Sequence, residues 1–462
     1  MVARYGRLLS AAALGIYAVV VVIPACRHPH TNGFAAYYTA SRILIETPAD
    51  LPRAYDDTWF QGRIDAFGFA GVLDVLLVQT PALSLILAPI AWLSLERARV
   101  IWILASVLFW IGGLAVLARA LGMNQRLLLP LAALTAAYVP LADNFRQGQA
   151  YALIFLLLCL VFRFAVADES RRHWLAGVPL GVMLVLKGAG LWLWLLLLAA
   201  RSWRVVAGAI ATAAVMVAAS APWIGWSAWE PFLLDLPRLA SDPVRYVTAY
   251  QTITSLIGHL FTFDSFWNPR PVADLRHLAT GLTIAVTALV FITSVRVQRL
   301  ASPDLGVRAL SLAMLAAPAV CMAPVGEGYH YVQVLPAVVV AFWWAVQRGA
   351  SLRSWCVLAA SALLLLAPVR FLTAGFLRDG WRAVLAYPRV YGALLLWVWL
   401  LATLRRSQDI VPDAAVQRRP VAAPRTCSRQ EGFPVPGFPM EKGVQRLNAR
   451  PLGEQQRVRP RR

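Results

Sequence analysis

The sequence predicts an all-α polytopic membrane protein with about 11–13 transmembrane helices. Of its 462 residues, 59% are hydrophobic and only 14% carry a charge, whereas a soluble domain is typically about 25% charged. Apolar runs such as residues 8–26, 100–117 and 205–221 are close to the length that a helix needs to cross a ~30 Å hydrocarbon core. Closed helices are required there because lipid offers no hydrogen-bond partner to an open backbone.

Two long polar stretches, at 27–71 and 226–277, separate the apolar segments into groups. The first segment is expected to be an uncleaved helix, because no convincing small-x-small cleavage site follows it. The second is expected to be broken near Pro81 and Pro89, since proline interrupts a helix. The predicted helices cover residues 8–26, 72–95, 100–118, 127–142, 150–167, 174–186, 189–200, 203–225, 278–297, 308–323, 330–346, 354–371 and 390–404.

The positions of the arginines predict the orientation. Positive charge collects in short cytoplasmic loops of the bacterial plasma membrane, which places both termini of this multi-pass chain in the cytoplasm. Residues 1–405 then form the transmembrane domain, with 27–71 and 226–277 as extracytoplasmic loops, the first of them carrying interfacial helices. Residues 406–462 contain too few apolar residues to fold, and we expect a disordered, basic cytoplasmic tail.

One conflict remains in this orientation. The arginine pairs before and after segment 100–118 cannot both be cytoplasmic if segment 72–95 crosses the membrane once. A broken or re-entrant segment around Pro81 would remove the conflict.

The composition also argues against several functions. The net charge of +20 does not indicate a nucleic-acid partner, because the basic residues lie in short loops and in the tail. The five cysteines are scattered without CxxC spacing, so neither a metal site nor a disulfide framework is expected. The sequence contains no Walker A, HExxH, GxSxG or Rossmann glycine motif, and we expect no cofactor. Membrane lipids are the expected surroundings.

The first polar stretch combines aromatic side chains with carboxylates. NGFAAYYTASRIL at 32–44 is typical of an amphipathic helix at the membrane interface, with Arg42 four residues after Tyr38. Tyr37 and Tyr38 are either interfacial anchors or substrate contacts. Asp56 and Asp57 are either a solvated pair in a loop or a base above a substrate hydroxyl.

A polar turn, DNFRQGQA at 143–150, lies between two apolar segments. Asp143 and Asn144 are expected to cap free backbone groups at the helix ends. Gln147 and Gln149 flank a glycine, and an amide at the start of the next helix can bind a sugar or a phosphate.

Lys187 is the only lysine before the tail, and it lies between two apolar runs. A lone ammonium there is costly unless it is paired, reaches the interface or meets an anion. Gly188 and Gly190 allow the helix to break and leave the lysine facing a cavity. We therefore favour a functional role over simple snorkelling.

A fourth polar cluster, APVGEGYHYVQVLP at 323–336, contains Glu327 and His330 three residues apart. A histidine near a carboxylate is a common acid/base pair. The alternative is a loop in which His330 caps the following helix.

Six short motifs follow one another along the chain: FAAYYTASR, AYDDTWFQ, QTPALSLILAPIAWL, the Gly148–Gln149 turn, GVMLVLK ending at Lys187, and PVGEGYHYV. This order resembles the bacterial polyprenol-phosphate-mannose-dependent α-mannosyltransferases of the glycosyltransferase C superfold. The resemblance covers roughly residues 1–405.

The resemblance implies a polyprenyl-phosphate sugar as donor, with mannose the expected sugar, and an extracytoplasmic lipid or glycan acceptor. Transfer would invert the anomeric carbon, with a carboxylate as base and the lipid phosphate as leaving group. It implies that Lys187, Arg42 and His330 bind the donor phosphate. Tyr37, Tyr38, Gln147 and Gln149 would bind the sugar or the acceptor.

The sequence departs from this family at the expected base. An acidic residue usually precedes the Phe of the first aromatic motif, but here Asn32 and Gly33 precede Phe34, and neither accepts a proton at neutral pH. Either Asp56, Asp57 or Glu327 has taken over the role, or the chain is an inactive relative that serves as an assembly partner. A flippase or transporter of lipid-linked sugars is the other alternative, although no inverted repeat is visible.

Overall fold

The computed structural model describes residues 2–76, 79–167, 170–241, 246–368 and 375–407. Within these ranges the protein is helical, and the only β-contacts are the isolated bridges Tyr250–Glu327 and Asp264–Asn268. The predicted all-α class is therefore confirmed. The predicted tail lies outside the described residues, apart from its first two positions.

The helical elements follow in this order: α1 (Val2–Tyr17), η1 (Ala18–Val22), α2 (Ile23–Arg27), α3 (Phe34–Glu46), η2 (Pro48–Tyr55), α4 (Asp57–Ile64), η3 (Asp65–Phe69), η4 (Pro81–Leu83), α5 (Ser84–Leu87), α6 (Leu95–Ala120), η5 (Gln125–Leu127), α7 (Leu128–Ala136), α8 (Val139–Gln147), α9 (Tyr151–Ala165), η6 (Ser170–Ala176), α10 (Gly177–Lys187), α11 (Leu191–Ala199), α12 (Trp203–Ile224), η7 (Trp226–Ala228), α13 (Trp229–Ser241), α14 (Ile253–Phe261), α15 (Arg276–Val297), α16 (Leu305–Ala316), α17 (Ala319–Met322), η9 (Gly328–Val334), α18 (Leu335–Gln347), α19 (Leu352–Leu365), η10 (Gly375–Leu377), η11 (Gly380–Ala386) and α21 (Pro388–Arg406).

Six of the described helical spans are long and apolar enough to cross a membrane, and eight if each of two bent pairs counts as one span. This is fewer than the 11–13 expected, because apolar helices such as α9 and α19, with 15 and 14 residues, are shorter than a full span. Apolar side chains on α12 and α15, including Val215, Ile284 and Leu289, are exposed. An apolar surface of this kind suits contact with lipid. The chain is thus a multi-pass membrane protein.

The structure corrects the helix predicted over 72–95. Residues 70–76 are not helical, and the described residues 79–94 contain only η4, α5, turns and bends. A helix of four residues covers about 6 Å, so this segment does not cross a ~30 Å core. The arginine pairs on both sides of segment 100–118 conflicted only if segment 72–95 crossed the membrane once, and this segment does not cross it.

Glycines bring helices of the bundle into close contact. A Cβ atom added at Gly177 of α10 would lie 2.3 Å from the Val205 carbonyl oxygen of α12, and one at Gly181 would lie 2.6 Å from that of Ala209. A Cβ at Gly208 would likewise meet the Trp174 carbonyl at 2.3 Å. Small residues of this kind let helix backbones approach within a membrane. They fix α10, which ends at Lys187, against α12.

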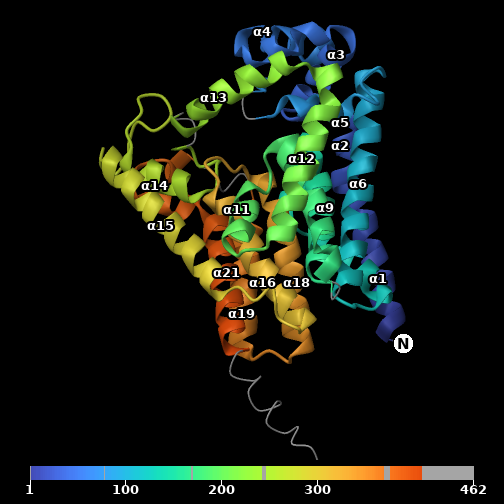
Figure 1. The fold of residues 1–462 in the computed structure, drawn as a ribbon, viewed down its shortest axis with the longest axis vertical. Helices are drawn as coiled ribbons and strands as arrows, with labels where there is room; N and C mark the ends of the chain where they lie inside the picture. Colours follow the sequence, from blue (N-terminus) through green and yellow to red (C-terminus); the bar gives the residue numbers. More distant parts are fainter. Residues whose placement is uncertain (1, 77–78, 168–169, 242–245, 369–374, 408–462) are drawn as a thin grey trace, which may run out of the picture. The chain divides into compact units, whose positions relative to one another are not determined.

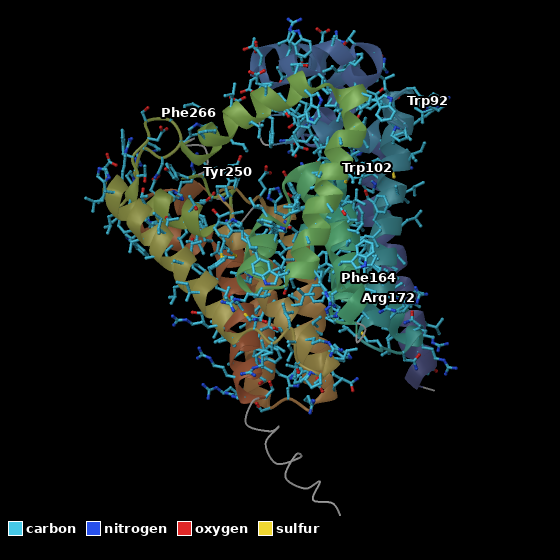
Figure 2. The ribbon with its side chains drawn as sticks, viewed as in Figure 1. Trp92, Trp102, Phe164, Arg172, Tyr250 and Phe266 are labelled. Carbon is cyan, nitrogen blue, oxygen red and sulfur yellow. The ribbon has the colours of Figure 1, made fainter. Side chains whose placement is uncertain are left out.

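Helices α3 and α4 lie across one end of the bundle, and the N-terminus of α1 lies toward the opposite end (Figure 1). Beside the start of α6, Trp92 projects from the surface, whereas Trp102 of α6 is buried (Figure 2). The indole of Trp102 donates to the Gly148 carbonyl at 2.7 Å. Gln251 N–H donates to the Gly326 carbonyl at 2.7 Å, which connects the second long loop to the segment before η9.

A buried arginine of α6 fastens the chain that precedes α3. The Arg99 side chain is fully buried and donates to the Ala25 carbonyl at 2.8 Å and to the Thr31 hydroxyl at 3.1 Å. It also donates to the carbonyls of Phe145 and Arg146. One guanidinium thus holds the end of α2, the entry to α3 and the end of α8 together.

Candidate functional site

The candidate site is centred on Lys187, the last residue of α10. Gly188 and Gly190 follow with φ angles of 61° and 82°, a left-handed conformation that glycine adopts without a steric cost. The predicted break is therefore present, and it separates α10 from α11. Only 7% of Lys187 is exposed, so the ammonium does not reach open solvent.

Three side chains surround this ammonium. Its Nζ donates to Gln79 Oε1 at 2.9 Å, and it lies 5.1 Å from the ring centroids of both Tyr37 and Tyr151. Burial lowers the pKa of Lys187 to about 7, while the carboxylates of Glu327 and Asp74 act in the opposite direction. The aromatic faces and the two carboxylates favour the charged form of the lysine, against the effect of burial.

The QTP segment positions the end of α10. The Thr80 hydroxyl donates to the Val185 carbonyl, one of the carbonyls that the helix end leaves free. The preceding Gln79 accepts from Lys187 through its side chain, and its carbonyl accepts from the Tyr55 hydroxyl at 2.9 Å. The segment therefore holds Lys187 in position through hydrogen bonds and is not part of a transmembrane helix.

Asp74 is a site residue that the sequence analysis missed. Its Oδ2 accepts from the backbone N–H groups of Gly33 and, at 3.0 Å, of Ala36, at the N-terminus of α3. Its Oδ1 accepts from Val75 N–H at 3.0 Å. The side chain remains partly exposed. The signal that could have identified it is a lone carboxylate within an apolar run, GVLDVLLV, because such a residue is costly in a membrane helix.

Glu327 approaches the lysine from the segment before η9. The Tyr329 hydroxyl hydrogen-bonds to its carboxylate, and both Lys187 and Asp74 are close enough to act on it electrostatically. Burial raises the pKa of Glu327, and Lys187 and Tyr329 counteract part of this effect. Burial also raises the pKa of Asp74, against the backbone N–H groups and Lys187. Two carboxylates thus share one buried cation.

His330 lies within the same cluster. Its ring is 4.4 Å from that of Tyr151 and 4.8 Å from that of Tyr329. Among the described residues no ion pair joins the side chains of Glu327 and His330; the contact between them is the backbone bond from His330 N–H to the Glu327 carbonyl. The structure therefore places both residues beside Lys187 but does not show the predicted acid/base pair.

Gln149 faces the same cluster from the start of α9. Its Oε1 accepts from the Tyr37 hydroxyl, and only 4% of the residue is exposed. A Cβ at Gly33 would lie 2.1 Å from Gln149 Nε2. Gln147 lies at the edge of this region, where its backbone carbonyl accepts from the Thr31 hydroxyl. Lys187, Glu327, His330, Tyr37 and Gln149 thus belong to one cluster.

The capping prediction for the 143–150 turn is half right. Asn144 Oδ1 accepts from Tyr151 N–H at 2.8 Å and so caps α9. Asp143 is instead buried inside α8, where its Oδ2 forms an ion pair with Arg389 of α21 at 3.2 Å and its Oδ1 pairs with Arg146.

The other predicted residues lie away from this contact network. Asp56 is exposed and caps α4 by accepting from the N–H groups of Thr58 and Trp59. Asp57 is exposed in the first turn of the same helix. Their positions fit the solvated alternative of the sequence analysis.

Arg42 and Tyr38 of α3 contact residues outside the Lys187 cluster. Arg42 forms an ion pair with Glu46. The Tyr38 hydroxyl donates to the Leu93 carbonyl at 2.8 Å and accepts from Arg42. In the described contacts neither side chain touches Lys187.

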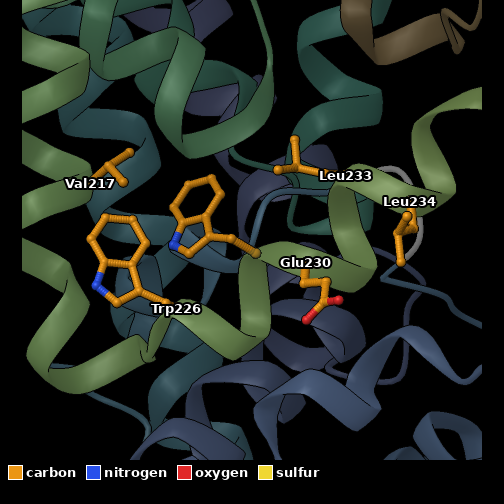
Figure 3. Close-up of a pocket in the computed structure, with 6 residues that line it drawn as sticks. Val217, Trp226, Glu230, Leu233 and Leu234 are labelled. Atoms are coloured by element: carbon orange, nitrogen blue, oxygen red, sulfur yellow. The ribbon is translucent and has the colours of Figure 1, made fainter.

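An apolar groove of about 500 Å³ lies between α12 and the η7–α13 segment (Figure 3). It is lined by Val217, Trp226, Trp229, Glu230, Leu233 and Leu234. On α13, Phe232 packs against Tyr55 with ring centroids 6.1 Å apart, and Tyr55 donates to Gln79. Helix α13, which carries part of the groove lining, thus contacts Tyr55, and Tyr55 donates to the partner of Lys187.

Gly33→Ala should destabilise the protein. Gly33 has φ 89° and ψ −61°, a conformation unfavourable for alanine, and its new Cβ would displace Gln149. We expect a loss of about 1–3 kcal/mol in the free energy of unfolding, measured as a lower Tm in detergent. Gly62→Ala in α4, where a Cβ meets nothing within 4 Å, is the matched control and should be neutral or stabilising. Equal Tm values for the two variants would contradict the strain argument.

The bundle and the buried cluster define a polytopic membrane protein with a polar site at its helix ends. A family model, Glycosyltransferase family 87, matches residues 78–324, more than half of the chain. The chain therefore belongs to glycosyltransferase family 87, and its class is that of the membrane glycosyltransferases. The matched region contains Gln79, Gln149 and Lys187. No curated protein and no solved structure matches the chain significantly.

Proposed function

We propose that the protein transfers a hexose, with mannose the expected sugar, from a polyprenyl-phosphate donor to a lipid or glycan acceptor on the extracytoplasmic face. The observation that carries this proposal is the cluster around Lys187. It gathers a buried cation, two carboxylates, a histidine, two amides and three tyrosines from segments far apart in the chain. This set suits the recognition of both an anion and a sugar.

Lys187 is the proposed partner of the donor phosphate. Cleavage of the sugar–phosphate bond leaves negative charge on the phosphate oxygen, and a fixed cation with little access to water stabilises that charge strongly. His330, beside Tyr151, can donate a hydrogen bond to the same group. Arg42 on α3 remains a second candidate cation, and its partners in the structure are Glu46 and Tyr38. A phosphate leaving group needs no metal ion and no strong general acid.

Gln149 and Tyr37 are the proposed sugar contacts. Their side chains already hydrogen-bond to each other, so each is held in one orientation while retaining further bonding capacity. Tyr38 and Gln147 remain candidates for the acceptor side. Asp56, Asp57 and Glu327 are the carboxylates that the sequence indicates as base, and of these Glu327 lies beside Lys187.

The apolar groove between α12 and α13 is the proposed path of the isoprenoid chain. Tryptophan and leucine side chains line it, and such surfaces gain free energy when they cover hydrocarbon. The groove lies beside an element that contacts the site, because Phe232 of α13 packs against Tyr55, and Tyr55 donates to Gln79, the partner of Lys187. The arginine distribution supports an extracytoplasmic site, with both termini in the cytoplasm.

The test uses the full chain in lipid vesicles with radiolabelled polyprenyl-phosphate-mannose and a bacterial membrane lipid fraction as acceptor. We expect label in a glycolipid or lipid-linked glycan, with and without a metal chelator. Movement of the labelled lipid between leaflets without a new glycosidic bond would indicate a flippase. No transfer and no movement would favour an inactive assembly partner.

A further inference from the structure

We infer that Asp74 is the general base of this glycosyltransferase, the group that removes the proton from the acceptor hydroxyl. The inference rests on the proposed function, because it concerns the same site and reaction. Its starting point is the contact between the Asp74 carboxylate and the N–H groups of Gly33 and Ala36. Gly33 and the preceding Asn32 occupy the positions where the sequence lacks the expected acid. A carboxylate from 41 residues further along the chain thus lies at that place.

The hydrogen bonds of Asp74 leave room for one substrate hydroxyl. A carboxylate has about four lone-pair sites. Gly33 and Ala36 use two of them on Oδ2, and Val75 uses one on Oδ1. One site on Oδ1 remains, and the side chain is partly exposed. Three backbone donors also hold the carboxylate in a fixed orientation, which a base needs for proton transfer.

The charges around Asp74 suit a base that works beside a leaving phosphate. Lys187 stabilises the ionised form of Asp74, while burial makes that form more basic than in water. The same lysine is the proposed phosphate partner. One cation is therefore close both to the group that gains a proton and to the group that gains negative charge, and Glu327 also acts on it electrostatically.

The other carboxylates are less suited to this role. Asp56 is engaged as the cap of α4, and Asp57 is exposed on the same helix. Glu327 lies beside Lys187, but the described contacts give its carboxylate one side-chain donor, the Tyr329 hydroxyl, and no backbone donor. Glu327 is therefore better placed to compensate the charge of Lys187.

The proposed transfer step forms one bond at the anomeric carbon and breaks another. The acceptor oxygen forms a bond to the anomeric carbon as the bond from that carbon to the phosphate oxygen breaks. The phosphate leaves with the bonding electron pair as an anion beside Lys187. The acceptor proton passes to Asp74 Oδ1, and the anomeric carbon is inverted.

The decisive variant is Asp74→Asn. The amide oxygen of asparagine can still accept from Gly33 and Ala36, so the cap of α3 is retained, but an amide takes up no proton at neutral pH. We expect a Tm close to that of the wild type, donor binding within a few-fold, and a fall in kcat of roughly 10²–10⁴-fold. Asp304→Asn is the matched control, because Asp304 caps α16 through Val307 N–H and the variant also exchanges a capping carboxylate for an amide; it should retain wild-type transfer.

Azide distinguishes a base from a merely structural residue. Azide ion attacks the anomeric carbon without losing a proton, so Asp74→Asn should form a glycosyl azide while failing with hydroxyl acceptors. Near-wild-type transfer by Asp74→Asn, or a stable variant inactive with both nucleophiles, would overturn the assignment. If the wild type itself transfers no sugar, the proposed function fails, which is a separate result.

A pH profile covers the case in which Asp74→Asn does not fold. Transfer by the wild type should fall with decreasing pH as the base becomes protonated, with a midpoint above the usual aspartate value of about 3.9, because burial raises the pKa of Asp74. The ionisable groups that face it are Lys187, Glu327 and Tyr37. The same fall in the transfer rate at low pH should be seen in the variants Glu327→Gln, Asp56→Asn and Asp57→Asn. Its disappearance in any of these variants would assign the base to that residue and overturn the proposal.

Discussion

Replacing Lys187 by Met should lower the rate of sugar transfer by roughly 10²–10³-fold, the usual effect of removing one fixed stabiliser of developing charge. Methionine fills a similar volume between Tyr37 and Tyr151, so the loss reflects the charge and not the packing. The measurement is kcat with radiolabelled polyprenyl-phosphate-mannose. If Lys187 acts on the leaving phosphate, kcat should fall more than donor affinity.

Two further variants make this test specific. Arg126→Met removes a positive charge from the exposed η5 segment and should leave transfer unchanged. Lys187→Arg retains the charge but exchanges a compact ammonium for a planar fork, and it should regain part of the activity if the geometry tolerates it. Transfer by Lys187→Met within ten-fold of the wild type, with the fold intact, would remove Lys187 from the mechanism.

Arg389→Met should cost about 3–5 kcal/mol of stability, since it removes the buried partner of the Asp143 carboxylate and leaves only the half-exposed Arg146 beside it. Arg389 is fully buried, and only 5% of Asp143 is exposed. Their N–O distance is 3.2 Å, and the bond connects α8 with α21. Thermal unfolding in detergent should show a markedly lower Tm for the single variant. Combining it with Asp143→Leu should restore part of the loss, because the unpaired charge is then removed as well.

An exposed ion pair provides the comparison. Arg270 and Asp379 lie 3.1 Å apart, with side chains 75% and 41% exposed. Pairs of this kind contribute about 0–1 kcal/mol, so Arg270→Met should hardly change the Tm. Equal losses for Arg270→Met and Arg389→Met would show that burial is not the source of the effect.

The sequence predicted well what depends on neighbouring residues. The first helix, the break after Lys187 and the capping role of Asn144 follow from local rules of apolar length, glycine conformation and helix ends. The solvated alternative for Asp56 is of the same kind, since an aspartate before a short helix is a typical cap.

The prediction failed where the determining contact is distant in sequence. Asp74 was hidden in GVLDVLLV, which has the composition of a membrane helix, and this segment is irregular because its polar partners come from the start of α3. No local pattern connects Asp74 to Gly33. The partner of Asp143 lies 246 positions away, so its role as half of an ion pair was equally invisible.

The glycine contacts between α10 and α12 also determine which parts of the protein can move during turnover. Because the backbones of α10 and α12 approach so closely at these glycines, one helix cannot slide along the other without collisions. Lys187, at the end of α10, is therefore held in a fixed position. Substrate entry and product departure must then be permitted by the connecting segments, above all 70–76 and the stretch before η9, where helical structure is absent. Turnover should therefore respond to crosslinks that immobilise these segments and remain unaffected by one that joins α10 to α12.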